Sequence, residues 1–396
     1  MKDIDDELLT RGIVNVYPSK EYVAARLARG EKLTIYLGID PTGPTLHLGH
    51  SIPLKKLGDF QKAGHKIILL MGDFTAMIGD PDKATARAPL TRKQILLNLK
   101  NYKSQASKIL SFTGKNPAKI MFNSKWLGKM NFEDVLNLAS QMTVQQMLKR
   151  DMFDRRIKEG KLIFIHEFMY PLMQGYDSVA MDVDGEIGGN DQTFNMLVGR
   201  DLMKTLKNKE KFVLTVKLLE DSEGNKMGKT EGNMVALSDT PEEMYGKVMS
   251  WNDGLIIPGF ELCTNVSMQE LEIIARELVD GSMNPRDLKM KLAYELTSLY
   301  HDKEKAKKAE NHFIEAFQNR EIPKDVLEIT VEKNTLLIDV LVKNNLVSSK
   351  TEFRRLVEDH AIMHLDTNEK VSNTQIITVS GVYRIGKKRF CKIIIK

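Results

Sequence analysis

The sequence predicts an α/β fold in its first half, followed by a helical region and a small α+β module at the C-terminal end. Three observations lead to this prediction. Short apolar runs alternate with helical patterns in the first half, the pattern becomes helical after about residue 240, and period-two runs with basic residues follow near the end. Strands that alternate with helices are typical of βαβ units, so we expect a parallel sheet.

Buried strands are expected at residues 33–39, 66–71 and 212–219, and the helical stretch between the first two is expected to end at Gly64. A polar segment, 221–233, follows the third strand. Further helices are expected from Thr91 towards residue 112, after Asn131, and over residues 165–181.

The helical region is expected to begin at Thr240-Pro241-Glu242-Glu243, which combines a capping threonine, a first-turn proline and a third-position glutamate. Helices continue to about residue 318, and the charged segment 321–334 is a plausible linker. Another capped helix begins at Ser349, and the period-two runs cover residues 376–379 and 383–395.

At 396 residues, 42% of them hydrophobic, the chain is long enough for a large core and for two or three domains. Residues 1–9 are acidic and lead into no apolar run, and no window reaches the roughly 18 apolar residues of a membrane span. A cytoplasmic protein without membrane contact is therefore expected. Cys263 and Cys391 are too few for a disulfide framework or a cysteine-built zinc site, so both are expected to be packing residues.

The excess positive charge lies in residues 335–396, which hold 11 lysines and arginines against 6 acidic residues, while the rest of the chain holds 47 of each sign. An anion-binding module attached to a neutral enzyme would have this distribution. A solvated basic face is the alternative.

The segment from Tyr36 to His50 joins a predicted strand to the start of a helix. Backbone N–H groups and the positive helix end bind phosphates at such a junction. Gly49 lets a nucleotide approach the backbone, and His47 and His50, three residues apart, can donate hydrogen bonds to phosphate oxygens. Two structural or metal-binding histidines would give the same pattern.

A polar loop after a predicted strand carries Lys226-Met227-Gly228-Lys229-Thr230. Two lysines three residues apart on a glycine-bearing loop can close over a triphosphate and supply cationic donors to it. A solvated lysine pair is the alternative for this loop alone. In order and spacing behind the histidine motif, the loop becomes a specific signal.

With these two motifs the sequence resembles the class I aminoacyl-tRNA synthetases, whose HIGH and KMSKS signatures occur here as HLGH and KMGKT. The likeness to the tyrosyl branch covers essentially the whole chain. It implies a Rossmann-like catalytic domain over residues 1–232 with an insertion at about 115–165, a helical tRNA-contacting domain over 233–325, and a basic RNA-binding domain over 335–396. It also implies a homodimer that uses L-tyrosine, ATP with Mg²⁺, and tRNA(Tyr), without a tightly bound metal.

The resemblance also identifies a tyrosine pocket. Its residues here are Tyr36, Asp80, Tyr170, Gln174, Asp177 and Gln192. In the family, the positions of Tyr36 and Asp177 bind the substrate phenol, those of Tyr170, Gln174 and Asp80 hold its ammonium group, and Gln192 lies alongside. Tyr170, Gln174 and Asp177 are at i, i+4 and i+7 and so share one helix face. A polar surface stripe is the alternative for that face.

The carboxylate of tyrosine is already a nucleophile, so its attack on ATP requires alignment and charge stabilisation more than a general base. The resemblance assigns this stabilisation to His47, His50, Thr42, Lys226, Lys229, and the loop pair Lys83 and Arg87. The ATP-binding positions are Gly38, Asp40, His47, Gly49, His50, Gly189, Asp191, Met227 and Lys229. Gly228 replaces the serine of KMSKS, but both lysines are present, so activity is expected.

The C-terminal module resembles a small RNA-binding domain shared with a ribosomal small-subunit protein. Phosphate contacts, which are independent of sequence and sensitive to salt, are expected from Arg354, Arg355, Arg384, Lys387, Lys388, Arg389 and Lys392. The family's glycine after the helix and its Asn-Gly turn are replaced by Asp359-His360-Ala361 and Asp366-Thr367-Asn368.

Three alternatives stay open from the sequence. A tryptophanyl-tRNA synthetase shares the fold and both signatures, but is not expected to carry Tyr36 with Asp177 or the basic module. A synthetase-derived RNA-binding or regulatory protein would have lost catalysis, which the complete pocket and both lysines oppose. A generic nucleotidyltransferase would need no tyrosine-pocket helix.

Overall fold

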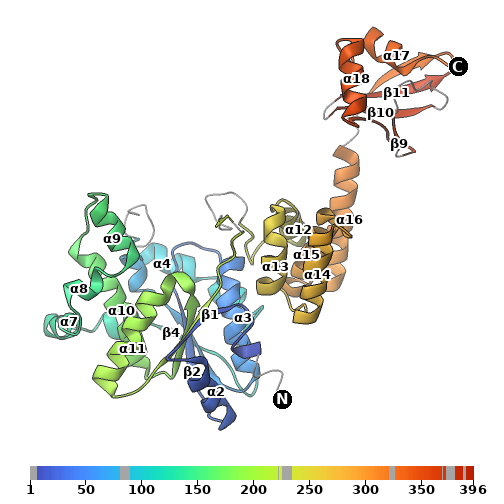
Figure 1. Cartoon of the computed structure of the whole chain (residues 1–396). Coiled ribbons are helices and arrows are strands. Elements are labelled where there is room, and N and C mark those ends of the chain that lie inside the picture. The colour runs from blue at the N-terminus through green and yellow to red at the C-terminus, as the bar shows by residue number, and fades with distance from the viewer. Residues whose placement is uncertain are drawn as a thin grey trace. The chain divides into compact units, whose positions relative to one another are not determined.

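The computed structural model describes residues 7–80, 90–221, 223–224, 234–320, 326–367, 369–371, 380–386 and 389–396, with 316–320 described by their backbone only. The chain divides into two compact units, Met1–Ala309 and Glu310–Lys396. Figure 1 shows the parallel sheet flanked by helices in the first unit and the smaller sheet with two helices in the second. The predicted α/β fold class is confirmed.

The first unit is built on a six-stranded sheet with the order β1-β6-β5-β2-β3-β4. Its strands are β1 (Ile13–Tyr17), β2 (Thr34–Ile39), β3 (Lys66–Met71), β4 (Lys119–Phe122), β5 (Gly185–Gly189) and β6 (Phe212–Val216). All neighbouring pairs are parallel except β1 with β6. The three predicted strands are confirmed, and the last ends at Val216 rather than at residue 219.

Helices connect and cover these strands. They are α2 (Lys20–Ala28), α3 (Leu48–Lys62), α4 (Arg92–Leu99), α5 (Tyr102–Ala106), α6 (Ser124–Leu127), α7 (Phe132–Ala139), α8 (Val144–Met147), α9 (Asp151–Lys158), α10 (Ile165–Met181) and α11 (Thr193–Lys207), with short 3-10 turns η1 (Thr75–Met77) and η2 (Asn190–Gln192). The expected caps at Thr91 and Asn131 are confirmed, because each side chain accepts a backbone N–H three residues on.

The prediction of one long helix from Thr91 towards residue 112 is wrong. The helix ends at Leu99, and a second one starts at Tyr102. Asn101 lies between them at φ −105° and ψ 0°, outside the helical region. Asparagine is a weak helix former because its side chain competes for nearby backbone groups, so the break falls at this position.

The remainder of the first unit is helical, as predicted. Its elements are α12 (Pro241–Met249), η3 (Asp253–Leu255), α13 (Ile256–Cys263), α14 (Met268–Asp280), α15 (Pro285–Tyr300) and the first part of α16 (Lys303–Arg320), which continues into the second unit. The capping box at Thr240 and Glu243 is confirmed by reciprocal hydrogen bonds of 3.2 and 3.0 Å. Arg11 ties this region to the start of β1, because its guanidinium donates to the carbonyls of Glu261 and Val266 at 2.9 and 2.6 Å.

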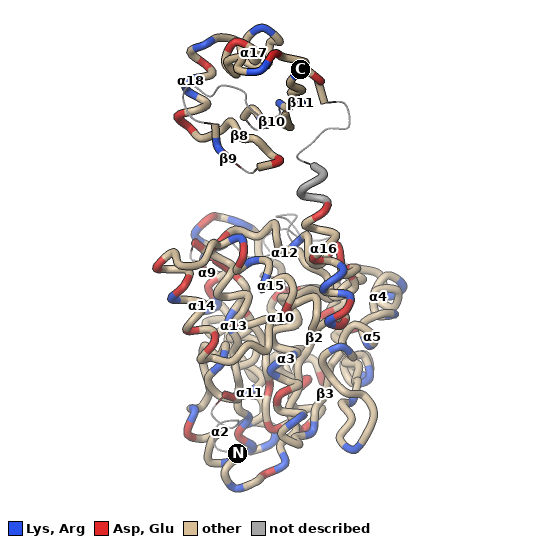
Figure 2. The backbone as a smooth tube through the Cα atoms, turned by 90° about the vertical axis from the view of Figure 1, so that its right-hand side faces the viewer, with Lys and Arg blue, Asp and Glu red and all other residues tan. Residues whose placement is uncertain are grey.

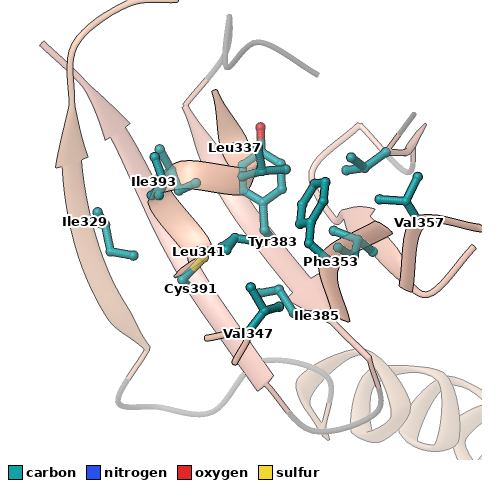
Figure 3. Packing of buried hydrophobic residues seen from close by; sticks show 13 residues of the cluster. Ile329, Leu337, Leu341, Val347, Phe353, Val357, Tyr383, Ile385, Cys391 and Ile393 are labelled. Atoms are coloured by element: carbon teal, nitrogen blue, oxygen red, sulfur yellow. The ribbon is translucent and has the colours of Figure 1, made fainter. Parts of the chain in front are cut away.

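The second unit is a five-stranded sheet with the order β7-β11-β10-β8-β9 and two helices. Its elements are β7 (Leu327–Val331), α17 (Leu337–Lys343), α18 (Lys350–Glu358), β8 (Ile362–His364), β9 (Glu369–Lys370), β10 (Gly381–Ile385) and β11 (Arg389–Ile395). Figure 3 shows Leu337, Phe353 and Ile393 packed together from α17, α18 and β11. These three side chains are at most 1% exposed, so the module has a core of its own.

The C-terminal period-two run over residues 383–395 forms two antiparallel strands, β10 and β11, rather than one. The chain turns after Ile385 at Gly386, which has φ +66° and adopts it without steric cost. The run at 376–379 lies outside the described residues. The cap at Ser349 is confirmed, and His360, which takes the place of the family's glycine, has φ +53°.

Both cysteines are buried, as expected of packing residues, and burial raises the pKa of each thiol to about 12. Within the described ranges, none of the helices has the length and apolar character needed to cross a membrane. Figure 2 shows basic and acidic residues interspersed along the first unit.

Gly185 at the start of β5 tests the packing of the sheet. A Cβ at this position would lie 2.0 Å from the ring of Phe212. Gly185→Ala is therefore expected to lower the free energy of unfolding by about 1–3 kcal/mol, the usual cost of overpacking a core. Gly246→Ala is the matched control, because Gly246 lies within α12 with nothing near its Cβ position, and the change should stabilise by about 0.5–1 kcal/mol. Chemical denaturation measures both, and equal stabilities would contradict the packing described.

Candidate active site

The sheet places the predicted site residues at the carboxyl ends of β2 and β5. From β2 the chain continues to β3 and β4 on one side, and it later returns to β5 and β6 on the other. Open α/β sheets bind ligands where the strand order reverses in this way. Tyr36 and Glu186 are paired in register within β2 and β5, below these carboxyl ends.

The histidine motif forms the N-terminus of α3. His47 is the N-cap, and its Nδ1 accepts the N–H of Gly49 at 3.1 Å, while His50 Nδ1 accepts the N–H of His47 at 3.3 Å. Because each Nδ1 is an acceptor, the neutral tautomer carries its proton on Nε2. The ring centroids are 3.9 Å apart. Two Nε2–H donors therefore lie together at a helix N-terminus, an arrangement suited to phosphate oxygens.

Gly49 is required by this arrangement, since a Cβ there would lie 2.9 Å from Cε1 of His47. The chain that follows the lysine loop pairs directly with the motif: Leu48 N–H donates to the carbonyl of Val235 at 3.0 Å, and Leu237 N–H to that of Leu46 at 2.8 Å. The two ends of the predicted nucleotide site are thus joined by backbone hydrogen bonds.

Asp177, on α10, is only 2% exposed. Its Oδ1 accepts the indole N–H of Trp126 at 2.7 Å, and its Oδ2 accepts an amide N–H of Asn123 at 3.2 Å. Burial raises the pKa of Asp177 well above its usual range, while the two donors oppose that shift. Both carboxyl oxygens therefore face N–H donors, which holds this group as a hydrogen-bond acceptor.

Tyr36 is fully buried, and its hydroxyl lies 2.9 Å from Ser178 Oγ. Burial raises its pKa far above 10, and the nearby carboxyls of Glu186 and Asp177 add to the effect. Tyr36 therefore keeps its proton. A protonated phenol and a carboxyl acceptor are thus present in the same buried region.

A second polar group surrounds Asp40 and Asp80. Tyr170 donates to Asp40 Oδ2 at 2.9 Å and Thr75 to Asp40 Oδ1 at 2.7 Å. Arg150 forms an ion pair with Asp80 at 2.7 Å, and Gln192 Nε2 donates to the other oxygen of Asp80 at 2.8 Å. Burial raises the pKa of Tyr170 well above its usual value, and the charges of Asp40 and Asp80 raise it further.

Gln174 hydrogen-bonds Glu186, the residue paired in register with Tyr36. Its Nε2 donates to Glu186 Oε1 at 3.4 Å. Its Oε1 is buried and, in the described part of the chain, has no hydrogen-bond donor. A buried acceptor without a partner is costly, so it marks a position where a ligand donor would bind.

The structure brings the six predicted tyrosine-pocket residues to this part of the sheet and places several predicted nucleotide-binding residues near them. Gly38 lies in β2 and Thr42 lies just after it. Asp191 lies in η2, directly after β5. A Cβ at Gly189 would lie 2.4 Å from Asp191 Oδ1, so a side chain there would displace the Asp191 carboxyl group. The predicted residues outside the described ranges are Lys83, Arg87, Lys226, Met227 and Lys229.

Sequence reasoning missed several residues that complete the site. These are Thr75, Asn123, Trp126, Arg150, Ser178, Glu186 and Lys211. A usable signal existed for two of them, because Glu186 and Lys211 are charged residues within or beside otherwise apolar strands. Ser178 directly follows Asp177 on α10, and the remaining four come from segments whose proximity only the fold reveals.

In the described residues, no group of three or more His, Cys, Asp or Glu side chains is arranged to hold a metal ion.

The predicted RNA-binding residues of the second unit differ in their surroundings. Arg354 and Arg355 are exposed on α18. Arg389 instead donates to the carbonyl of Leu346 and pairs with Glu352 at 2.9 Å, so it holds the module together. Lys387 and Lys388 lie outside the described residues.

Comparison with known proteins matches residues 28–318 to a family described as tRNA synthetases class I (W and Y). The chain is 44% identical over 394 residues to a tyrosine–tRNA ligase of Thermotoga maritima, covering 98% of this chain and 96% of that protein. It is 42% identical to tyrosine–tRNA ligase 2 of Vibrio cholerae, covering 98% of both.

Solved structures show the same fold. A C-terminally truncated mitochondrial tyrosyl-tRNA synthetase of Coccidioides posadasii matches with a TM-score of 0.63 and 25% identity, covering 78% of this chain and 91% of that one. The Archaeoglobus fulgidus tyrosyl-tRNA synthetase complexed with L-tyrosine matches with a TM-score of 0.61 and 23% identity, covering 78% and 99%.

The chain therefore belongs to the class I tRNA synthetases of the tryptophanyl and tyrosyl group. Within that group it falls among the tyrosine–tRNA ligases, since relatives that match over almost their whole length carry that name. The tryptophanyl alternative is not favoured.

The hydrogen bond from Trp126 to Asp177 predicts a shift in the titration of that carboxyl. Trp126→Phe removes an N–H donor that stabilises the ionised form, so the pKa of Asp177 is expected to rise further. Carbon-detected NMR of labelled aspartate measures this pKa. Trp251→Phe, which replaces the second tryptophan of the chain, is the control and should leave the pKa of Asp177 unchanged. An unaltered pKa in Trp126→Phe would contradict the contact.

Proposed function

We propose that the chain activates L-tyrosine with ATP, forming tyrosyl-adenylate and pyrophosphate, and then transfers tyrosine to the 3′ end of tRNA(Tyr). The observation that carries this proposal is the pairing of a buried carboxyl acceptor, Asp177, with a buried protonated phenol, Tyr36. A substrate phenol offers one O–H donor and one oxygen acceptor, and this pair complements both.

Discrimination against phenylalanine follows from the same groups. If phenylalanine entered, Asp177 and Tyr36 would be buried without the partner that a phenol supplies, at the full desolvation cost of those groups. Tyrosyl-tRNA synthetases are themselves the established example of this kind of discrimination.

The ammonium group of tyrosine would lie against Gln174, Tyr170 and Asp80. Gln174 Oε1, buried without a donor among the described residues, is the acceptor best suited to it. Asp80 is partly neutralised by Arg150, so the ammonium would join an existing charge pair. This limits the cost of leaving an acidic group uncompensated before substrate binds.

The reaction itself would use the helix end at His47 and His50. The substrate carboxylate attacks the α-phosphorus of ATP, a new carboxyl–phosphorus bond forms, and the bond to pyrophosphate breaks. The two Nε2–H groups and the N-terminus of α3 would stabilise charge on the phosphates as it develops, with Lys226 and Lys229 acting on the leaving group. ATP would bring Mg²⁺ as its counter-ion. The remaining nucleotide positions are those named above from the family resemblance.

The C-terminal module would contact tRNA through exposed cations. Arg354 and Arg355 point away from the core on α18 and support this role. Arg389, in contrast, is engaged within the module and would contribute indirectly. We accordingly propose residues 1–232 as catalytic, 233–325 as tRNA-contacting and 335–396 as RNA-binding.

The proposed activity is tested by ATP–pyrophosphate exchange with tyrosine, tryptophan and phenylalanine. Exchange that depends on tyrosine alone is the expected result. Exchange with tryptophan would agree with the family assignment but contradict tyrosine as the substrate. Silence with all three amino acids would favour a non-catalytic RNA-binding protein.

Asp177→Ala is expected to lower kcat/KM for tyrosine by about 10- to 160-fold, since a hydrogen bond to a charged group contributes about 1.5–3 kcal/mol. The variant should remain folded, and its KM for ATP should stay near that of the parent. Steady-state exchange measures both constants. Normal tyrosine activation in this variant would remove Asp177 from the pocket.

We also propose a homodimer formed through the segment that precedes and begins α10. Seven large apolar side chains there are more than half exposed: Phe132, Leu136, Val144, Ile157, Leu162, Phe164 and Ile165. Exposed apolar groups gathered in one segment are typical of a protein interface.

Leu162→Glu with Ile165→Glu is therefore expected to yield monomers at micromolar concentration, because charges would be buried in the interface. Sedimentation velocity measures the change. Leu97→Glu, at a residue 62% exposed on α4, is the control and should stay dimeric. A double variant that sediments as the parent would contradict this interface.

A further inference from the structure

A buried ion pair lies beneath the proposed pocket. Lys211, directly before β6, pairs with Glu186 of β5, and the two residues are 0% and 2% exposed. The ammonium of Lys211 also donates to Ser178 Oγ at 2.9 Å, and Ser178 Oγ lies 2.9 Å from the Tyr36 hydroxyl. Four side chains thus form a continuous hydrogen-bonded chain.

A contribution to the stability of the fold does not explain this ion pair. Removing two charges from water is expensive, and replacing a buried pair by apolar residues of similar volume is often neutral or stabilising. Its effect is instead to fix which neighbouring groups donate and which accept. Lysine is only a donor, and an ionised glutamate is only an acceptor.

The fold makes room for the pair by close helix packing. A Cβ at Gly199 of α11 would lie 2.7 Å from Lys211 Nζ and 3.0 Å from Ser178 Oγ. At Gly175 of α10, a Cβ would lie 3.1 Å from the backbone nitrogen of Gly199. Glycines at this helix crossing leave the ammonium group within reach of Ser178.

The direction of the hydrogen bonds follows from Lys211. Its ammonium donates to Ser178, which then has its own proton to give. Ser178's other side-chain partner in the described part of the chain is Tyr36. When Ser178 donates to Tyr36, the Tyr36 proton is left for an acceptor: the Glu186 carboxyl, which also hydrogen-bonds the Tyr36 hydroxyl, or the oxygen of a ligand that replaces it. Tyr36 would then donate a hydrogen bond to the phenol oxygen of the ligand, while Asp177 accepts a hydrogen bond from the phenol O–H.

Glu186 orients Gln174 so that an acceptor, rather than a donor, faces the ligand. Because Glu186 accepts, it attracts the amide nitrogen of Gln174, at 3.4 Å. The amide oxygen is then left on the other side, where it is buried without a donor among the described residues. That orientation presents an acceptor to the ammonium group of a ligand.

We propose that Lys211, Glu186 and Ser178 are positioning residues that set the polarity of the amino-acid pocket: a donor at its phenol end and an acceptor at its ammonium end. None of the three needs to touch the substrate. The proposal rests on the proposed function and deepens it, because it names the residues that determine selection of a phenol.

The phenol end is tested with Ser178→Ala, which leaves the ion pair intact. Three probes are used as substrates or competitors in the exchange assay: L-tyrosine, L-phenylalanine and des-amino tyrosine, which is 3-(4-hydroxyphenyl)propionate. Apparent affinity is expected to fall about 3- to 10-fold for both phenols and to stay unchanged for phenylalanine, as loss of one neutral hydrogen bond predicts. Ser178→Thr, which keeps the hydroxyl, should restore the parent values.

The ammonium end is tested with Lys211→Met combined with Glu186→Gln, which removes both charges together and leaves neither unpaired. Compared with Ser178→Ala, this double variant is expected to lose about 3- to 10-fold more apparent affinity for tyrosine and phenylalanine than for des-amino tyrosine. The KM for ATP and the thermal unfolding midpoint report whether each variant is folded.

Equal losses for all three probes in either variant would overturn the proposal, because a merely structural role would weaken every ligand alike. Unchanged affinities would overturn it as well. If the parent protein shows no tyrosine-dependent exchange, the proposed function fails instead, and direct binding of the three probes by calorimetry still tests the polarity of the pocket.

Discussion

The burial of charged and polar side chains beneath the carboxyl ends of β2 and β5 is the constraint on which the rest of the site depends. Asp177, Glu186 and Lys211 are each at most 2% exposed. Groups this far from water must find partners within the protein or on a ligand. The partners here come from four separate parts of the chain, so the sheet, α6, α10 and α11 have to be correctly packed before the pocket exists.

The same sheet edge also provides the nucleotide side. The turn after β2 leads into α3, whose first residues carry the two histidines, and the chain beyond the lysine loop pairs with that turn. We therefore place the proposed substrate recognition and phosphate chemistry on one strand, β2, with Tyr36 within it and the start of α3 beyond its carboxyl end. Movement of β2 relative to β5 would disturb both.

Much of this arrangement could be predicted from sequence where the signal is local. The strands at 33–39 and 66–71, the helix at 165–181 and the caps at Thr91, Asn131 and Thr240 follow from periodicity and capping chemistry. The break at Asn101 was missed because helix propensity is weak in the interior of a segment. Trp126 and Asn123 were missed because their contact with Asp177 spans 51 and 54 residues, and only tertiary packing brings them together.

A crystal structure with L-tyrosine bound would test the central claim most directly. The account predicts the phenol oxygen within hydrogen-bonding distance of both Asp177 and Tyr36, the ammonium group against Gln174 Oε1, Tyr170 and Asp80, and the Lys211–Glu186 pair unchanged beneath them. Tyrosine bound away from β2 and β5, or reversed so that its ammonium group faced Asp177, would contradict it.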